Sequence, residues 1–347
     1  PGLIDLHLHG LHRWRLDAGP EHLAAICKAL PRYGVTGFLP TIAPRPKGED
    51  AQFLASMASA RPAVRRCGAA VLGFHLEGPF LSLTGALPPD ALGTSDPERV
   101  RSLTAAARPH RAIFSVSPDF PGILDLLPLM TAGGTPAFMT HTAATVEQTQ
   151  AAIEAGVRHA THFYDVFPCP PVSEPGVRPC GAVEAVLADP RVSVDFILDG
   201  EHVHPAAVQV ALRCKGPGGV CLATDSNTGA GLAPGRYKTW AGDQVEFAYA
   251  GGPARLVGSP GTARRTAGWL AGSGLTLDRA VRNAVRMLGL DLLQAVRMAS
   301  ANPARVLGLE RRKGRIRKGY DADLILLDAD LQVRRTWVGG ARAFVEA

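Results

Sequence analysis

The chain has 347 residues, of which 46% are hydrophobic and 20% are charged, and this balance excludes an intrinsically disordered chain because disorder goes with few apolar and many charged residues. The net charge is +6, but the basic residues are dispersed and no nucleic-acid-binding module is recognisable, so we expect no nucleic-acid partner. No apolar run reaches the length of a membrane span, about 18 residues, so we expect no membrane partner.

Short apolar segments alternate with amphipathic segments over the first two thirds of the chain. We predict eight strands, at residues 2–9, 34–42, 70–77, 112–117, 137–141, 159–164, 193–199 and 220–225. Helical periodicity occurs between them, for example at residues 20–30, 51–60, 146–155 and 205–212. Strands that are apolar on both faces are typical of a parallel sheet. Eight strand–helix units therefore indicate an α/β fold of the (β/α)8 TIM-like barrel type. The alternative is a doubly wound sheet, but its usual Gly-rich turn does not follow the first strand.

The part of the chain beyond the eighth strand changes character. Two more helices are predicted at residues 277–288 and 292–307. Short strands separated by glycines are predicted after them, at residues 314–316, 322–327 and 337–345. We therefore expect a barrel domain at residues 1–308 and a small C-terminal β appendage at residues 309–347.

Residues that commonly ligate metals lie at or near the carboxyl ends of five predicted strands. They are His7 and His9 on the first strand, Glu77 on the third, His141 on the fifth, His162 on the sixth and Asp225 on the eighth. Barrel enzymes build their active sites at that end of the barrel. Side chains alternate along a strand, so the rings of His7 and His9 point the same way. Imidazoles and a carboxylate suit Zn²⁺ and similar ions, and the sequence therefore predicts a divalent metal site.

The expected nucleophile is a water molecule activated by the metal, because neither a GxSxG elbow nor a P-loop occurs in the sequence. Asp225 is then the candidate that takes and returns the proton of that water. No Lys lies between Lys47 and Lys215, which excludes a carbamylated Lys as a bridge between two metals and leaves Glu77 for that role. His202, just beyond the seventh predicted strand, is expected at the rim of the site, in reach of the substrate.

The cysteines give an expectation about the compartment. Six of them are scattered at positions 27, 67, 169, 180, 214 and 221, without a CxxC pair. We expect isolated buried thiols rather than a disulfide framework. This usage predicts a reducing compartment and a cytoplasmic protein.

Several segments resemble a known family. The opening strand PGLIDLHLHG (1–10) is similar to that of the amidohydrolase superfamily. The more specific resemblance is to the N-acetylglucosamine-6-phosphate deacetylases, and it lies in HLEGPF (75–80), HATHFY (159–164), DGEHV (199–203) and TDS (224–226). The resemblance extends over essentially the whole chain.

The resemblance implies a metal-dependent hydrolase that converts N-acetylglucosamine-6-phosphate into glucosamine-6-phosphate and acetate. It implies that Glu77, His141 and His162 hold the principal ion, which is zinc in the first instance, with Fe, Mn, Co or Ni as alternatives. His7 and His9 match a pair that adds a second ion in some members. Asp225 matches the catalytic acid/base, and His202 matches a residue that contacts the substrate. Members are homodimers, and in them a β segment before the position of Pro1 pairs with the C-terminal strands.

The sequence departs from the family at substrate positions. Leu87 stands where the family has a His, and Ser173 stands where it has a phosphate-binding Arg. Arg178 and Arg236 are candidates to compensate. These departures predict an altered substrate, such as an N-acyl compound without the phosphate. Two further alternatives are an amidohydrolase for another N-acyl amine or cyclic amide, and a metal-binding barrel without turnover.

Overall fold

The computed structural model describes residues 1–60, 68–88, 92–239, 243–258 and 267–346. Eight parallel strands follow one another around a barrel in chain order: β1 (Leu3–Leu8), β4 (Val35–Ile42), β6 (Phe74–Glu77), β7 (Ala112–Val116), β8 (Ala137–Met139), β9 (Val157–Ala160), β10 (Ser193–Ile197) and β11 (Val220–Ala223). Leu8 forms an isolated parallel bridge with Ser226, just after β11, and this bridge brings the last strand beside the first. The prediction of a (β/α)8 barrel is confirmed, and the doubly wound alternative is wrong.

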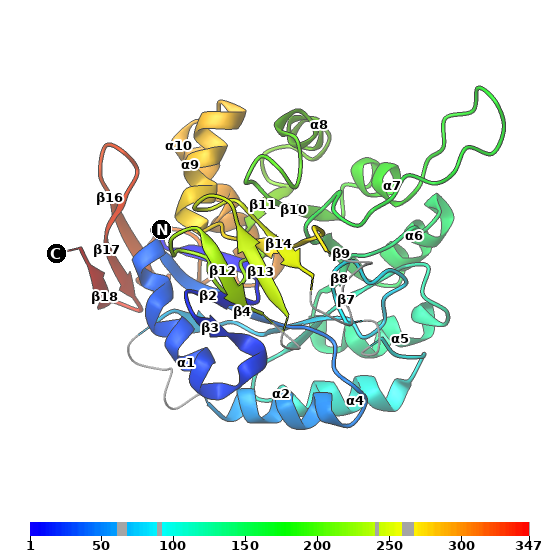
Figure 1. Ribbon diagram of the computed structural model, residues 1–347, viewed down its shortest axis with the longest axis horizontal. Helices are drawn as coiled ribbons and strands as arrows, with labels where there is room; N and C mark the ends of the chain where they lie inside the picture. The colour runs from blue at the N-terminus through cyan, green and yellow to red at the C-terminus, as the bar shows by residue number, and fades with distance from the viewer. Residues whose placement is uncertain (61–67, 89–91, 240–242, 259–266, 347) are drawn as a thin grey trace.

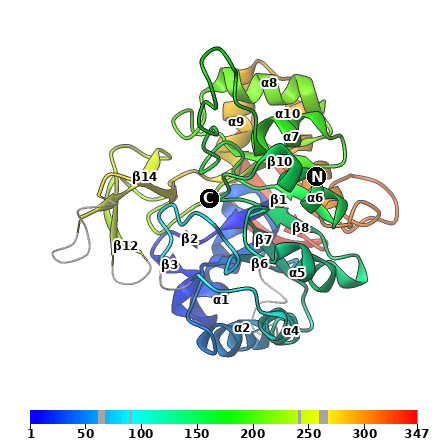
Figure 2. The same cartoon turned by 90° about the vertical axis from the view of Figure 1, so that its right-hand side faces the viewer.

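Helices pack around the outside of this barrel, and in Figure 2 they surround the strands. They are α1 (Pro20–Ala29), α2 (Glu49–Ser59), α4 (Pro97–Ala106), α5 (Ile123–Met130), α6 (Val146–Glu154), α7 (Ala182–Ala188), α8 (Pro205–Lys215), α9 (Leu277–Leu288), α10 (Leu292–Met298) and α11 (Ala301–Val306). Short 3-10 turns lie at η1 (Leu16–Ala18), η2 (Leu30–Tyr33) and η4 (Ala132–Gly134). The single helix predicted at 292–307 is therefore two helices, with Ser300 between them.

The strands are buried because helices cover their outer faces and side chains fill the barrel. All eight residues of β4 and all six of β1 are buried. Local signals start several helices: α6 begins with a capping box in which Thr145 and Gln148 each accept a hydrogen bond from the other's main-chain N–H. Two short elements complete the barrel region, the hairpin of β2 (Gly10–Leu11) and β3 (Trp14–Arg15), and β5 (Ala70–Val71), which pairs with β4.

An antiparallel sheet that the sequence analysis missed is inserted after β11. It consists of β12 (Gly235–Lys238), β13 (Gln244–Phe247), β14 (Pro253–Val257) and β15 (Leu270–Ser273). In Figure 1 it lies in front of the barrel, in yellow and green. The main-chain N–H of Ser273 donates to the carbonyl oxygen of Asp225 at 2.8 Å, which ties this sheet to the carboxyl end of β11.

A second antiparallel sheet forms the C-terminal part of the chain. It contains β16 (Leu324–Leu327), β17 (Val333–Val338) and β18 (Ala341–Val345). The segment predicted as a strand at 314–316 is a bend without regular secondary structure, and the strand predicted at 337–345 is two strands joined at Gly339–Gly340. Gly339 and Gly340 both have positive φ, as a tight turn there requires. The predicted appendage also includes Ala347, which lies outside the described residues.

The cysteines only partly follow the expectation. Cys27 and Cys221 are buried, but Cys169, Cys180 and Cys214 are exposed, so the expectation of buried thiols is wrong for these three; Cys67 lies outside the described residues. Among the described residues, every helix is too short or too polar to serve as a membrane-spanning segment.

Candidate active site

The six predicted ligand-type residues meet at the carboxyl end of the barrel, and all are buried: His7, His9, Glu77, His141, His162 and Asp225. Three of them share an unusual backbone. His141, His162 and Asp225 each stand two residues beyond the end of their strand, with φ of 49°, 32° and 44°. Positive φ is uncommon outside glycine, and strained backbone of this kind clusters at functional sites. A residue with positive φ therefore follows each of these three strands at the barrel mouth.

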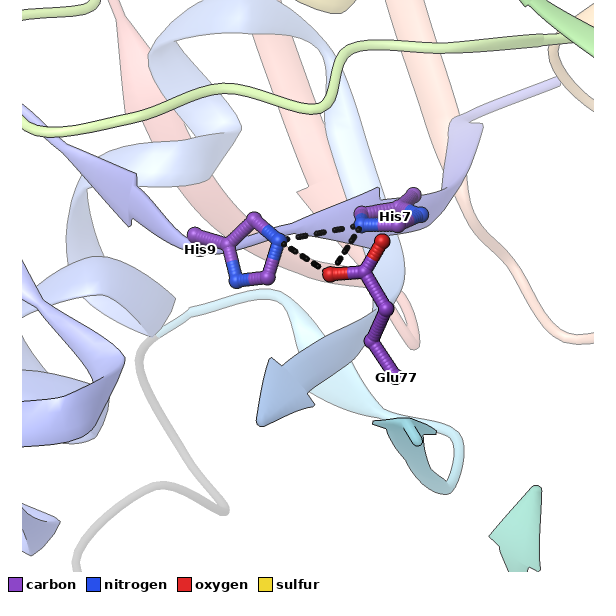
Figure 3. Close-up of side chains that lie close together, drawn as sticks. All are labelled: His7, His9 and Glu77. Carbon is purple, nitrogen blue, oxygen red and sulfur yellow. Dashed lines mark hydrogen bonds and ion pairs between the residues drawn. The ribbon is translucent and has the colours of Figure 1, made fainter. Parts of the chain in front are cut away.

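Glu77 stands at the centre and divides its two carboxylate oxygens between two pairs of histidines. Oε2 lies 3.1 Å from His9 Nε2 and 3.6 Å from His7 Nε2, and the two Nε2 atoms are 3.1 Å apart (Figure 3). Oε1 lies 3.0 Å from His162 Nε2 and 3.3 Å from His141 Nε2. In each group of three residues the ligand atoms lie within 4.8 Å of one another, so each group could hold a metal ion. Four imidazole nitrogens around one shared carboxylate are a donor set that suits divalent ions such as zinc.

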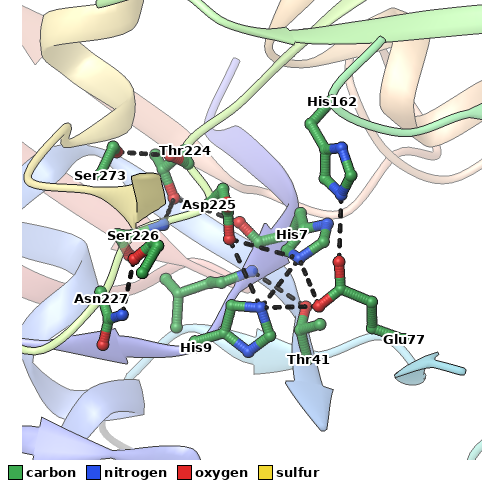
Figure 4. Close-up of polar contacts among 12 residues, drawn as sticks. His7, His9, Thr41, Glu77, His162, Thr224, Asp225, Ser226, Asn227 and Ser273 are labelled. Carbon is green, nitrogen blue, oxygen red and sulfur yellow. Dashed lines mark hydrogen bonds and ion pairs between the residues drawn. The ribbon is translucent and has the colours of Figure 1, made fainter. Parts of the chain in front are cut away.

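Asp225 lies on the side of His7 and His9 that faces away from Glu77 (Figure 4). Its Oδ1 is 3.4 Å from His7 Nε2 and 3.4 Å from His9 Nε2 (Figure 4), and this buried oxygen makes no hydrogen bond within the described part of the chain. The main chain fixes its position, since the N–H of Asp225 donates to the carbonyl of His7 at 2.9 Å. A side chain at Gly272 would come within 2.4 Å of the Asp225 carbonyl, so only glycine permits this approach of β15.

The protonation of Glu77 and His162 depends on their burial and on the charges and hydrogen bonds of their neighbours. Burial by itself would raise the pKa of Glu77, but the charge of His7 and the hydrogen bonds from His141 and His162 hold it well below its usual range. Burial would lower the pKa of His162, yet the hydrogen bond and charge of Glu77, with the charges of Asp165 and Asp225, raise it to about 10. Before any cation binds, the anionic carboxylate is therefore balanced by a proton on the ring of His162.

His202 follows β10, as predicted, and Asp199 holds its ring. Asp199 Oδ2 lies 2.6 Å from His202 Nδ1, and the other oxygen of Asp199 accepts from the main-chain N–H groups of Glu201 and His202, each at 2.9 Å. His202 Nε2 is buried and makes no hydrogen bond with the residues described. Burial would lower the pKa of His202, but Asp199, with Asp165 and Asp225, raises it. One ring nitrogen is thus available to a ligand.

The other predicted substrate residues are spread apart. Leu87 is buried and lines the cavity that also contains Glu77, His141, His162 and Asp225. Ser173 and Arg178 lie on an exposed segment between β9 and α7, which extends away from the barrel in green at the right of Figure 1. Arg178 is exposed and pairs with Glu184 at 3.2 Å. Arg236, on β12, is exposed and pairs with Glu246 at 3.2 Å, so the structure brings neither arginine to the cavity.

Sequence reasoning missed several cavity residues. Asp165 and Val166 line it three and four residues after His162, and Leu270, Ala271 and Gly272 line it from β15. Asp165 directly follows the motif HATHFY (159–164), so its charge was a readable signal. The β15 residues carried no such signal, because small and apolar residues occur at most strand ends.

Comparison with known proteins gives consistent matches. The model of the amidohydrolase family matches residues 136–346. An N-acetylgalactosamine-6-phosphate deacetylase of Escherichia coli O157:H7 is 32% identical over 351 residues, which are 99% of this chain and 87% of the relative. An N-acetylglucosamine-6-phosphate deacetylase of Vibrio furnissii is 32% identical over 347 residues, covering 99% of this chain and 82% of the relative.

Solved structures agree in the fold. A variant of the N-acetyl-D-glucosamine-6-phosphate deacetylase of Mycobacterium smegmatis, in complex with N-acetyl-D-glucosamine-6-phosphate, superimposes with a TM-score of 0.86 at 31% identity, over 100% of this chain and 86% of that one. The N-acetylglucosamine-6-phosphate deacetylase of Thermotoga maritima gives a TM-score of 0.85 at 27% identity, over 100% and 88%.

Proposed function

Since the chain belongs to the amidohydrolase family and, within it, to the N-acetylglucosamine-6-phosphate deacetylases, we propose that it hydrolyses the N-acetyl group of an N-acetylated amino-sugar 6-phosphate. With N-acetylglucosamine-6-phosphate the products are glucosamine-6-phosphate and acetate. The observation that carries the proposal is the arrangement of Glu77 between two His pairs, with an Asp225 oxygen beside them that makes no hydrogen bond among the described residues.

Membership of the family implies a divalent metal ion, and the donor set fits one. We propose zinc, with Fe, Mn, Co or Ni as alternatives. Glu77, His141 and His162 would hold the principal ion, and His7 and His9 with Glu77 would hold a second. The chemistry that such an ion supplies is polarisation of a carbonyl and a lower pKa for a coordinated water.

Asp225 is proposed as the acid/base of the reaction. As a carboxylate it accepts a proton from the attacking water while the new C–O bond forms at the acetyl carbon. It then donates that proton to the amine nitrogen as the C–N bond breaks, which leaves the free amine and acetic acid, and the acid ionises to acetate at neutral pH. Its buried Oδ1, aimed at the centre and without a hydrogen bond among the described residues, supports this role. His202 Nε2 is proposed to contact the substrate.

The direct experiment measures acetate release by the metal-loaded chain. N-acetylglucosamine-6-phosphate and N-acetylgalactosamine-6-phosphate are offered in parallel, because relatives of both names match. We expect release from at least one, and none from metal-depleted protein. Full metal occupancy without acetate release from any N-acyl substrate would instead support a metal-binding barrel without turnover.

A second candidate function is hydrolysis of an N-acyl amine or cyclic amide that carries no phosphate. It is favoured by the charges around the cavity, whose described lining residues include the carboxylates Glu77, Asp165 and Asp225 but neither Arg nor Lys. A dianionic phosphate prefers charge-assisted donors, and Arg in particular. A kcat/KM higher for N-acetylglucosamine than for its 6-phosphate would support this candidate. A strong preference for the phosphate that is lost in Arg178→Ala or Arg236→Ala would exclude it.

Replacing Asp165 by Asn should shift the balance between these substrates. The change removes a negative charge from the cavity wall and keeps the side-chain shape. We expect the ratio of kcat/KM for the phosphorylated to the unphosphorylated sugar to rise roughly fivefold, which corresponds to about 1 kcal/mol of relieved repulsion. Because it is a ratio, effects of the change on the shared chemistry cancel. An unchanged ratio would show that the phosphate binds away from Asp165.

The assembly of the protein is proposed from the resemblance, its location from the cysteine usage and its domain division from the change of pattern along the chain. We infer a homodimer, and we infer that the exposed segment carrying Ser173 and Arg178 contributes to its interface. We also infer a cytoplasmic location and a boundary between the two domains at residues 308 and 309. Light scattering coupled to size exclusion tests the dimer, and a monomer at all concentrations would contradict it.

A further inference from the structure

A buried polar cluster that the proposed function does not use lies on β9, on the residue directly after it and on β10. His159, Thr161 and Asp195 are its members, and none of them is accessible to solvent. Asp195 Oδ2 lies 2.9 Å from His159 Nε2, and Asp195 Oδ1 accepts the main-chain N–H of His162 at 2.5 Å. The Thr161 hydroxyl donates to Asp195, with distances of 3.2 and 3.3 Å to the two carboxylate oxygens.

These hydrogen bonds determine which ring nitrogen of His7 carries a proton. A threonine hydroxyl has a single proton, and the proton of Thr161 is directed to Asp195. The Thr161 oxygen is then an acceptor toward its other neighbour, His7 Nδ1, at 3.1 Å. A ring nitrogen that faces an acceptor is the protonated one, so Nδ1 carries the proton and Nε2 of the neutral ring keeps its lone pair.

The lone pair of His7 Nε2 faces the two other members of its candidate metal site, His9 and Glu77. His7 Nε2 is the atom that lies 3.1 Å from His9 Nε2 and 3.6 Å from Glu77 Oε2. His141 shows the same device built from the main chain, since its Nδ1 faces the carbonyl oxygen of Leu83 at 3.1 Å while its Nε2 faces Glu77. Two candidate ligand rings are thus oriented by different means, and only that of His7 depends on a side chain.

We propose that Thr161, held by Asp195, is a positioning residue that sets the ring tautomer of His7 and keeps His7 Nε2 available to a metal ion bound with His9 and Glu77. The proposal rests on one part of the proposed function, which is the assignment of His7, His9 and Glu77 as ligands of a second ion. Partners that orient a metal-bound His typically change metal affinity by about 10- to 100-fold when they are removed.

The test is a Co²⁺ titration of the metal-depleted full chain, followed by absorbance and metal analysis without substrate. Thr161→Val removes the hydroxyl at nearly constant shape, and Thr161→Ser keeps it. Thr149→Val is the matched control, because Thr149 is equally buried and donates to the main-chain carbonyl of Thr145, just before α6, at 2.8 Å. We expect two ions in the parent, a roughly 10- to 100-fold weaker second ion in Thr161→Val, recovery in Thr161→Ser, and parental binding in Thr149→Val.

Several results would overturn the proposal. They are unchanged Co²⁺ binding in Thr161→Val, an equal loss in Thr149→Val, no recovery in Thr161→Ser, or a parent that binds a single ion. Nitrogen-15 spectra of the histidine-labelled zinc form supply a second readout, since they should show His7 protonated at Nδ1 and metal-bound at Nε2. The reverse assignment would also contradict the proposal. Both measurements omit substrate, so a chain that binds two ions as described but releases no acetate would contradict the proposed function alone.

Discussion

Replacing Asp225 by Asn is expected to lower kcat by about 10²- to 10⁴-fold, the usual contribution of a general acid–base. Asn has the same shape but does not accept and return a proton at neutral pH. The fold should survive, because the main-chain N–H of Asp225 and the main-chain carbonyl make the hydrogen bonds that fix this position, to His7 and Ser273. Most of the bound metal should also remain, since neither candidate ligand group includes Asp225.

The measurement combines steady-state acetate release, metal analysis and thermal unfolding. Asp125→Asn makes the same chemical change on an exposed turn of α5 and should leave all three unchanged. A near-parental kcat in Asp225→Asn would remove this carboxylate from the mechanism. A large loss of metal in the same variant would instead make it a ligand.

Replacing Glu77 by Gln is expected to deplete both candidate metal positions at once. Each carboxylate oxygen serves one His pair, and Gln supplies neither the negative charge nor two equivalent oxygens. Lewis-acid stabilisation of a transition state is worth several kcal/mol, so kcat/KM should fall by about 10³-fold or more.

Replacing His162 by Ala should remove the ion held with Glu77 and His141, while the ion held with His7 and His9 should be retained in part.

Metal content per chain, measured after dialysis against a weak chelator, separates these outcomes. His22→Ala is the control, because His22 lies outside the cluster and accepts a hydrogen bond from the main chain of Arg15. Full metal occupancy and activity in His162→Ala would show that the ligand assignment is wrong. Equal and complete metal loss in Glu77→Gln and His162→Ala would indicate one cooperative centre rather than two positions.

The positions of the candidate ligands relative to the strands were readable from the sequence for a physical reason. Strands of a parallel barrel are buried on both faces, so they appear as apolar runs, and polar residues at their ends are conspicuous. Parallel strands all end on one face, which predicts that His7, Glu77 and His162 meet although they are far apart in the chain. That His7 and His9 face the same cluster was likewise predictable, because side chains two residues apart on a strand point the same way.

The tertiary structure alone decided how those residues are arranged. Nothing local predicts that Glu77 divides its oxygens between two His pairs, because that division depends on the relative heights of four different strands. The positive φ of His141 and Asp225 depends in the same way on surrounding contacts that hold a strained turn. The link from Asp195 through Thr161 to His7 joins β10, the end of β9 and β1, and such long-range hydrogen bonds leave no periodic pattern.

The substrate side of the site was the least predictable from sequence. The sheet β12–β15 consists of short strands among glycines, so its contribution of Gly272 beside Asp225 depends on packing against the barrel. Arg178 and Arg236 were reasonable candidates by charge, but each pairs with a nearby glutamate at the surface. Sequence by itself determined the barrel and the chemistry at its strand ends, since both follow from local periodicity and strand direction. Only the tertiary structure decided which loops and charges face the cavity, because loop paths depend on contacts between residues distant in the chain.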